Sequence, residues 1–173
     1  HAVTSAGGVS YSYDANGNQV AGDGRSIAYG VFDKPTLITK GTESTAFDYG
    51  LGNQRIRRTD DNAVDGAKTT WYFGSVERIQ VGNGNAYFKR YLGGVAIADY
   101  YPSTGVQDLH YLVKDHLGSI HPITDETGLA ANAEGLSFNA FGQRRAVDWS
   151  ALLTGSSLAY ANSKTTRGFT GHE

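Results

Sequence analysis

Cysteine and methionine are absent from the 173-residue chain, and proline occurs only three times. Without cysteine there is no disulfide bond and no thiolate metal site. No apolar run approaches the roughly 20 residues that cross a bilayer as a helix, so no membrane span is expected. The first residues lack the basic and apolar regions of a signal peptide, and no initiator methionine is present. We therefore expect the chain to be a piece of a longer protein.

Charged residues are also scarce, at 18% of the chain, with a formal net charge of -2 and a pI of about 6.2. A balance so close to neutral does not favour binding to the phosphate backbone of a nucleic acid, and no nucleic-acid partner is expected. Two small basic clusters are interpreted as solvated strand faces: Arg55–Arg58 and Arg144–Arg145.

Glycine and aromatic residues are abundant instead, with 23 Gly, 11 Tyr, 7 Phe and 2 Trp. Glycine favours turns, and each aromatic side chain can bury roughly 150–250 Å². This combination indicates a folded chain with many turns and few long helices.

Short apolar and aromatic runs alternate with turn residues, which predicts an all-β antiparallel meander with at most one or two short helices. The expected strands are 9–13, 26–29, 36–39, 44–49, 54–59, 69–73, 76–81, 86–92, 95–101, 107–114, 119–124 and 136–141. Asn16-Gly17 predicts a type I′ hairpin turn, which needs positive φ at both central residues. Asp148 could cap a short helix over 149–153 that closes at Gly155.

Alternation along two of these strands predicts which side chains share a face. Trp71 and Phe73 are expected to pack in the core, with Tyr72 on the opposite face. Leu109, Tyr111 and Val113 are expected to form one apolar face.

The chain also contains weak internal repeats, which combine an aromatic strand end, a glycine turn and a polar or basic strand start. They are Tyr13–Val20, Asp48–Arg55 and Phe138–Arg145. One such hairpin is marginally stable in water, whereas stacked hairpins bury their faces against one another.

Tyr-Asp-x-x-Gly-Asn at 13–18 resembles the YD (tyrosine–aspartate) repeat. Four further motifs follow in order: Asp-His-Leu-Gly-Ser at 115–119, Thr-Asp-x-x-Gly at 124–128, Phe-Gly-Gln-Arg at 141–144 and Phe-Thr-Gly-His-Glu at 169–173. Together they resemble the core region of bacterial RHS-repeat proteins. By this resemblance, residues 1–70 are YD-repeat β-hairpins, and residues 71–173 are a continuous RHS-associated core region upstream of a self-cleavage site.

The resemblance implies a β-ribbon that spirals into a hollow shell around a C-terminal toxin or effector polypeptide. The partners that it implies are the remaining shell repeats and the enclosed effector. It also implies export from a bacterium, to the medium or the cell surface. An isolated piece would expose unpaired strand edges, through which it could self-associate.

Two alternative functions stay open. One is a carbohydrate- or receptor-binding β surface, suggested by Tyr72 and Tyr100. The other is a supporting part of an aspartic-type self-cleaving core, suggested by Arg167–Glu173. In the family, the cleaving aspartates follow the Phe-Thr-Gly-His-Glu motif, and no Asp-Pro-x-Gly signature occurs in this chain. No catalytic residue is therefore carried over.

No catalytic, cofactor-binding or metal-binding residue is predicted, and the segment is not expected to be an enzyme or to hold a cofactor. Asp115 and His116 are adjacent, and adjacent side chains of a strand point to opposite faces. His110, His116 and His121 could approach one another across strands, but the five histidines lack a metal-binding spacing. The acidic loop Asp60–Gly66 could bind Ca²⁺, although it lacks the final glutamate of an EF-hand.

Overall fold

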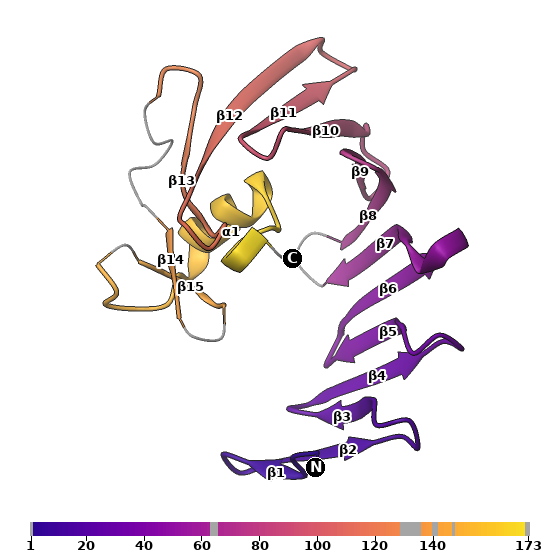
Figure 1. The fold of residues 1–173 in the computed structure, drawn as a ribbon. Coiled ribbons are helices and arrows are strands. Elements are labelled where there is room, and N and C mark those ends of the chain that lie inside the picture. Colours follow the sequence, from indigo (N-terminus) through magenta and orange to yellow (C-terminus); the bar gives the residue numbers. More distant parts are fainter. Residues whose placement is uncertain (1, 63–65, 129–135, 140–141, 147, 172–173) are drawn as a thin grey trace. The chain divides into compact units, whose positions relative to one another are not determined.

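The structure is a computed structural model that describes residues 2–62, 66–128, 136–139, 142–146 and 148–171 (Figure 1). Its strands are β1 (Ser5–Ala6), β2 (Val9–Tyr13), β3 (Gln19–Gly22), β4 (Arg25–Tyr29), β5 (Pro35–Lys40), β6 (Glu43–Tyr49), β7 (Arg55–Asn62), β8 (Gly66–Phe73), β9 (Val76–Val81), β10 (Tyr87–Leu92), β11 (Ala96–Tyr101), β12 (Val106–Lys114), β13 (Ile120–Thr124), β14 (Leu136–Phe138) and β15 (Arg144–Ala146). The helices are α1 (Gly155–Lys164) and two 3₁₀ turns, η1 (Leu51–Asn53) and η2 (Phe169–Gly171).

The all-β prediction is confirmed. Strands β1 to β13 are neighbours in sequence order in one 13-stranded sheet, and β14 pairs with β15 in a second, two-stranded sheet. The chain divides into two compact units: unit 1 comprises His1–Lys89 and Tyr101–Thr104, and unit 2 comprises Arg90–Tyr100 and Gly105–Glu173.

In unit 1, large side chains alternate with small polar ones along the strands. Ile27 of β4 pairs with Ile38 of β5, whereas the next pair along the two strands is Ser26 with Thr39. Period-two alternation sends these two pairs to opposite faces of the sheet. The register through β6, β7 and β8 places Ile79 of β9 on the same face as Ile27 and Ile38, and Ile79 is only 3% exposed.

Three turns of unit 1 repeat one hydrogen-bond pattern, at residues 14–18, 30–34 and 50–54. In each, the first N–H donates to the carbonyl of the fifth residue (2.9 Å in all three), and the fourth N–H donates to the carbonyl of the first (3.1–3.2 Å). The fourth residue has positive φ in every case: Gly17 at 87°, Asp33 at 54° and Asn53 at 58°. At 14–18 and 30–34 this is a type I turn followed by a G1 bulge, whereas at 50–54 Gly52 also has positive φ (76°), so the central turn there is not type I.

The hairpin predicted at Asn16-Gly17 therefore exists, but the predicted type I′ turn is wrong. Gly17 has positive φ and Asn16 does not. Asp14 fixes the turn instead, because its Oδ1 accepts hydrogen bonds from the N–H groups of Asn16 (2.9 Å) and Asn18 (2.8 Å). Positive φ at two consecutive turn residues, 54° and 70°, is found at Asp23-Gly24, between β3 and β4.

The Asp14 turn should weaken in acid. Hydrogen bonds, first from the Asn18 side chain and then from nearby backbone N–H groups, hold the pKa of Asp14 below its usual range. The ionised Asp14 therefore stabilises the turn fully at pH values above its pKa in the unfolded chain, which is about 3.9. This stabilisation is lost as the pH falls through the lower pKa that Asp14 has in the folded chain. We expect the NMR shifts of the Asn16 and Asn18 amides to titrate together below about pH 3.9. In an Asp14→Asn variant this titration should disappear, and its persistence would assign it to another group.

Three tyrosines close the strand pairs at the edge of the sheet where no turn joins them. Tyr13 donates its hydroxyl to the carbonyl of Val3 (2.9 Å). The hydroxyl of Tyr29 donates to the carbonyl of Gln19 (3.1 Å), and the hydroxyl of Tyr49 donates to the carbonyl of Pro35 (2.9 Å). Each tyrosine ends a strand, and each acceptor lies at the start of the preceding strand or just before it. We call these bonds the tyrosine clamps.

At the next strand pair, β7 and β8, an arginine fills this role. The guanidinium carbon of Arg55 lies 5.6 Å from the ring centroid of Phe47 and 4.8 Å from that of Tyr72. Cation–π contacts of this kind join β6, β7 and β8 on the face that carries Ile27, Ile38 and Ile79.

Replacing Tyr29 with phenylalanine is expected to lower the free energy of unfolding of unit 1 by about 1 kcal/mol, because one hydrogen bond to a backbone carbonyl is lost. Urea denaturation followed by Trp71 fluorescence, in a Trp149→Phe background, measures this loss. Tyr11→Phe is the matched control, since the Tyr11 hydroxyl has no hydrogen-bond partner among the described residues. Equal losses in the two variants would contradict a clamp at Tyr29.

The core of unit 2 is a cluster of six buried residues with Leu153 packed against it: Tyr91, Ile97, Leu112, Ile120, Ile123 and Ala161. Leu109, Tyr111 and Val113 do share a face, but it is the outer one, since Tyr111 is 42% and Val113 48% exposed. The buried face of β12 carries His110 and Leu112.

Two further predictions are wrong. Phe73 is 62% exposed because it ends β8 beside the turn to β9. Trp71 lies on the same outer face, where the guanidinium carbon of Arg78 is 4.4 Å from the centroid of its ring. The helix begins at Gly155 and does not cover 149–153. Asp148 instead accepts hydrogen bonds from the backbone (3.0 Å) and hydroxyl (2.6 Å) of Ser150, and Trp149 has φ of 67°, which a right-handed helix excludes.

Candidate functional site

Three motif segments that lie far apart in the sequence meet in unit 2. The N–H of Ile120, just after the Asp-His-Leu-Gly-Ser segment, donates to the carbonyl of Gly168 (3.2 Å). The N–H of Thr170 donates to Oγ of Ser119 (3.1 Å). Arg144, from the Phe-Gly-Gln-Arg segment, bonds the chain just before Gly168. We call this cluster the motif junction, comprising residues 115–120, 138–139, 142–144 and 165–170.

Asp115 builds the first segment. Its Oδ1 accepts hydrogen bonds from the N–H groups of Leu117 and Ser119, both at 2.8 Å, and this turn repeats the pattern of unit 1. Burial pushes the pKa of Asp115 upward, but the hydrogen bonds from Ser119, Leu117 and His121 outweigh it, so the pKa lies below its usual range. The His121 Nε2 lies 3.5 Å from Asp115 Oδ2, while His116 is exposed on the turn. Asp115 therefore holds the turn and positions buried Ser119.

Arg144 joins the Phe-Gly-Gln-Arg segment to the chain around Gly168. Its Nη2 donates to the carbonyls of Thr165 and Arg167, both at 3.0 Å. Its guanidinium carbon lies 5.7 Å from the centroid of the Phe138 ring. Burial lowers the pKa of the Arg144 guanidinium, since a low-dielectric site disfavours the charge. Arg144 thus fixes the path of the chain that leads from α1 into η2.

Two glycines allow this close approach. A Cβ atom on Gly168 would lie 3.0 Å from Cε1 of Phe138 and 3.5 Å from Cζ of Arg144. A Cβ atom on Gly142 would lie 3.4 Å from Cβ of Phe169. The ring centroids of Phe138 and Phe169 lie 5.9 Å apart, and the planes of the two rings meet at an angle of 52°. The aromatic and glycine residues of the motifs therefore have a packing role at the junction.

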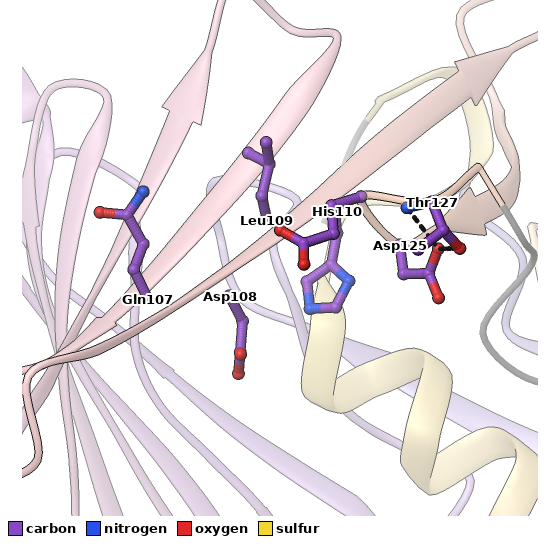
Figure 2. A pocket seen from close by; sticks show the side chains of 7 residues that line it. Gln107, Asp108, Leu109, His110, Asp125 and Thr127 are labelled. Carbon is purple, nitrogen blue, oxygen red and sulfur yellow. Dashed lines mark hydrogen bonds between the residues drawn. The ribbon is translucent and has the colours of Figure 1, made fainter.

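A cavity of about 180 Å³ lies elsewhere in unit 2, between β12 and the turn after β13 (Figure 2). Its lining residues are Gln107, Asp108, Leu109, His110, Asp125, Glu126 and Thr127. Asp125 Oδ1 accepts hydrogen bonds from the N–H (2.9 Å) and hydroxyl (2.6 Å) of Thr127, so this carboxylate stabilises the turn. His110 is 6% exposed, and its Nε2 lies 3.0 Å from Nζ of Lys164.

The described residues contain no group of three or more His, Cys, Asp or Glu side chains that could hold a metal ion. His110, His116 and His121 therefore do not form the cluster considered from the sequence. In the acidic loop, Asp60 Oδ1 accepts hydrogen bonds from Thr45 (2.9 Å) and Arg58 (2.8 Å), and Asp65 lies outside the described residues. In the part of the chain that the structure describes, no helix has the length and apolarity to cross a membrane.

The aromatic residues considered for ligand binding are placed differently from one another. Tyr72 is half-buried against Arg55, and Tyr100 is half-buried near the end of β11. The exposed aromatic side chains include Phe32, Phe73 and Trp149, at 66%, 62% and 60%. Phe141, His172 and Glu173 of the sequence motifs lie outside the described residues.

No family model and no curated protein matches the sequence. Solved structures do match its fold. The Tc holotoxin pore of Photorhabdus luminescens, with a substituted TccC3, matches 92% of this chain with a TM-score of 0.72 and 16% identity. The TcdB2–TccC3–Cdc42 complex also matches 92% of this chain, with a TM-score of 0.70 and 16% identity. The TcdB2–TccC3 complex matches 92% of this chain with a TM-score of 0.71 and 15% identity. This chain spans only 8% of the length of each of those chains.

Proposed function

We propose, from the RHS-repeat fold of this chain, that it is a structural, non-enzymatic wall segment of a hollow protein shell. The observation that carries the proposal is the uninterrupted run of 13 strands in sequence order, in a fold shared with Tc toxin chains over 92% of the length. A meander of this kind extends by adding hairpins, each of which buries its face against the last.

The repeated local structure supports this reading. The turns that follow β2, β4 and β6 share one hydrogen-bond pattern, and the tyrosine clamps hold the strand pairs between them. We assign residues 1–70 to YD-repeat hairpins and residues 71–173 to the RHS-associated core. The replacement of the clamp by Arg55 and Tyr72 near residue 70 is in keeping with that boundary.

We further propose that the parent shell is exported from a bacterium and encloses a C-terminal toxin or effector polypeptide. Its partners would be the other shell repeats and the enclosed polypeptide. Limited proteolysis of the full-length parent protein tests this. The downstream polypeptide should resist cleavage, and Ile97→Asp, which places a charge in the core of the wall, should expose it. Equal cleavage of the downstream polypeptide with and without this substitution would overturn enclosure while leaving the fold intact.

An isolated wall segment should self-associate. Strand β1 has only β2 as a neighbour in the sheet, so its outer edge presents unpaired backbone groups. Light scattering of the 173-residue chain is expected to show oligomers or aggregates. A stable, monodisperse monomer would contradict this prediction.

A carbohydrate- or receptor-binding surface is the second candidate. The observation that favours it is Trp149, which is 60% exposed and presented by a turn in which the Arg145 guanidinium lies 5.8 Å from its ring. Planar exposed aromatic rings suit stacking on sugar rings. A glycan array probed with the wild type and with Trp149→Ala tests this, with Tyr72→Ala and Tyr100→Ala alongside. If no glycan binds, the carbohydrate-binding hypothesis is wrong.

Support of an aspartic-type self-cleaving core is the third candidate. It is favoured by the motif junction, which anchors the segment around Gly168 and Thr170 through backbone hydrogen bonds. In a longer chain that contains the downstream residues, spontaneous scission should depend on residues 169–173. Scission that persists after their deletion would show that this segment is not needed.

A further inference from the structure

A buried imidazole lies outside the motif junction. His110 stands in the middle of β12 and is 6% exposed, next to the core residue Leu112. Its Nε2 is 3.0 Å from Nζ of Lys164, the last residue of α1. A lysine ammonium has only donors, so Nε2 must accept the hydrogen bond. With Lys164 charged, the imidazole that accepts this hydrogen bond is neutral and carries its proton on Nδ1.

We propose that the His110–Lys164 pair is an acid-sensitive latch, which fastens α1 to the sheet of unit 2 at neutral pH and releases it at acidic pH. The proposal concerns unit 2 alone and does not depend on the enclosure of an effector.

Protonation breaks this contact for a direct chemical reason. A proton on Nε2 occupies the lone pair that accepts the Lys164 hydrogen bond, and it places two cations about 3 Å apart. An imidazole undergoes this change of charge between about pH 5 and pH 8. The latch therefore contributes stability above that range and loses it as pH falls.

On the sheet side, the other ionisable groups around His110 are carboxylates. The pairs Tyr111–Thr124 and Leu112–Ile123 put Asp125 at the next position, opposite His110. Asp108 lines the same cavity (Figure 2). The neighbouring strand β11 carries buried Asp99.

On the helix side, α1 contributes Lys164 and Tyr160. Burial, followed by the charge of Asp125, raises the pKa of Tyr160, so its hydroxyl stays neutral throughout the range. A proton on Nε2 therefore removes the acceptor of this Lys164 hydrogen bond, and the imidazolium is attracted to the nearby carboxylates.

Release at Lys164 would reach the motif junction, because the two are adjacent in the chain. Ala161, three residues earlier, is 3% exposed in the core, and Thr165, the next residue, is 1% exposed. The carbonyl of Thr165 accepts one of the two hydrogen bonds from Arg144. The Arg167 guanidinium then lies 4.0 Å from the ring centroid of Tyr91. Loosening the end of α1 therefore loosens the chain that leads into Gly168.

Hydrogen exchange of the full 173-residue chain tests the latch. Amides of 155–164 should exchange at least about tenfold faster at pH 5 than at pH 8, after correction for the intrinsic rates. Equal protection at both pH values would overturn the proposal. In a His110→Gln variant, the amide oxygen can accept from Lys164 but does not titrate. Its helix should exchange slowly at both pH values, and an unchanged acid response would overturn the latch.

A second variant keeps the test independent of how well glutamine fits at position 110. Lys164→Met removes the donor and retains helix propensity. Its helix should exchange rapidly at both pH values, and a response equal to that of the wild type would overturn the proposal. His116→Gln and His121→Gln are matched controls, because these imidazoles lie on or beside the Asp115 turn. Both should keep the wild-type response, and its loss in either would place the sensor there instead.

Discussion

Replacing Ile97 with alanine is expected to lower the free energy of unfolding of unit 2 by about 2–5 kcal/mol. Ile97 has no exposed surface and lies in the core cluster with Leu112 and Ile123. The substitution removes three carbon atoms from water-free packing and leaves a cavity that the surrounding strands can close only in part. Because Ile97 is completely buried among these side chains, we expect a cost toward the upper end.

Urea denaturation followed by Trp149 fluorescence, in a Trp71→Phe background, measures this loss for unit 2. Val95→Ala is the matched control, since Val95 lies two residues away and is 63% exposed. It should change stability by less than about 0.5 kcal/mol. A similar cost for the two variants would mean that the buried cluster does not hold unit 2 together.

The strands could be predicted from the sequence because their signals are local. The run from Val76 to Val81 was expected as a strand from its composition and its flanking turns, and β9 has these same bounds. Strand endings were harder to predict where a turn residue is not glycine. Asp33 and Asn53 take the left-handed conformation that Gly17 takes in the equivalent turn, so the hydrogen-bond pattern that the three turns share is hidden in the sequence.

Side-chain faces were predicted less well than strands. Trp71 and Phe73 were expected in the core because they are the larger apolar residues of β8. The sheet instead buries the other face, where Thr70 is 5% exposed and Tyr72 stacks with Arg55. The choice of face depends on the register with β7 and β9, which a single strand does not contain.

The helix was missed for a related reason. Its sequence, Gly-Ser-Ser-Leu-Ala-Tyr-Ala-Asn-Ser-Lys, has few large apolar residues, and the residue that it buries in the core is the small Ala161. No apolar stripe marks such a helix. The motif junction was equally hidden, because Ser119 and Thr170 meet across 51 residues. The resemblance gave the order of the motifs but not their contacts.

Replacing Arg144 with leucine should lower the stability of the motif junction by about 2–4 kcal/mol, since hydrogen bonds to a charged donor are lost and their carbonyl acceptors are left without it. Those acceptors belong to Thr165 and Arg167, and Thr165 is only 1% exposed. Arg144→Lys should recover part of the loss, because an ammonium keeps the charge but cannot reproduce the fork of a guanidinium. Local hydrogen exchange at Ile120 and Thr170 is the readout, because their amides bond within the junction.

Arg145 provides the matched control for this prediction, because it is the next residue of β15 and points to the opposite face. Its guanidinium bonds the carbonyl of Trp149 and lies 5.8 Å from the Trp149 ring. Arg145→Leu should cost no more than about 1 kcal/mol and should leave exchange at Ile120 and Thr170 unchanged. If both leucine variants accelerated exchange at these two amides equally, the effect would belong to β15 as a whole. A specific effect of Arg144 would instead show that one side chain joins two of the sequence motifs into a single structure.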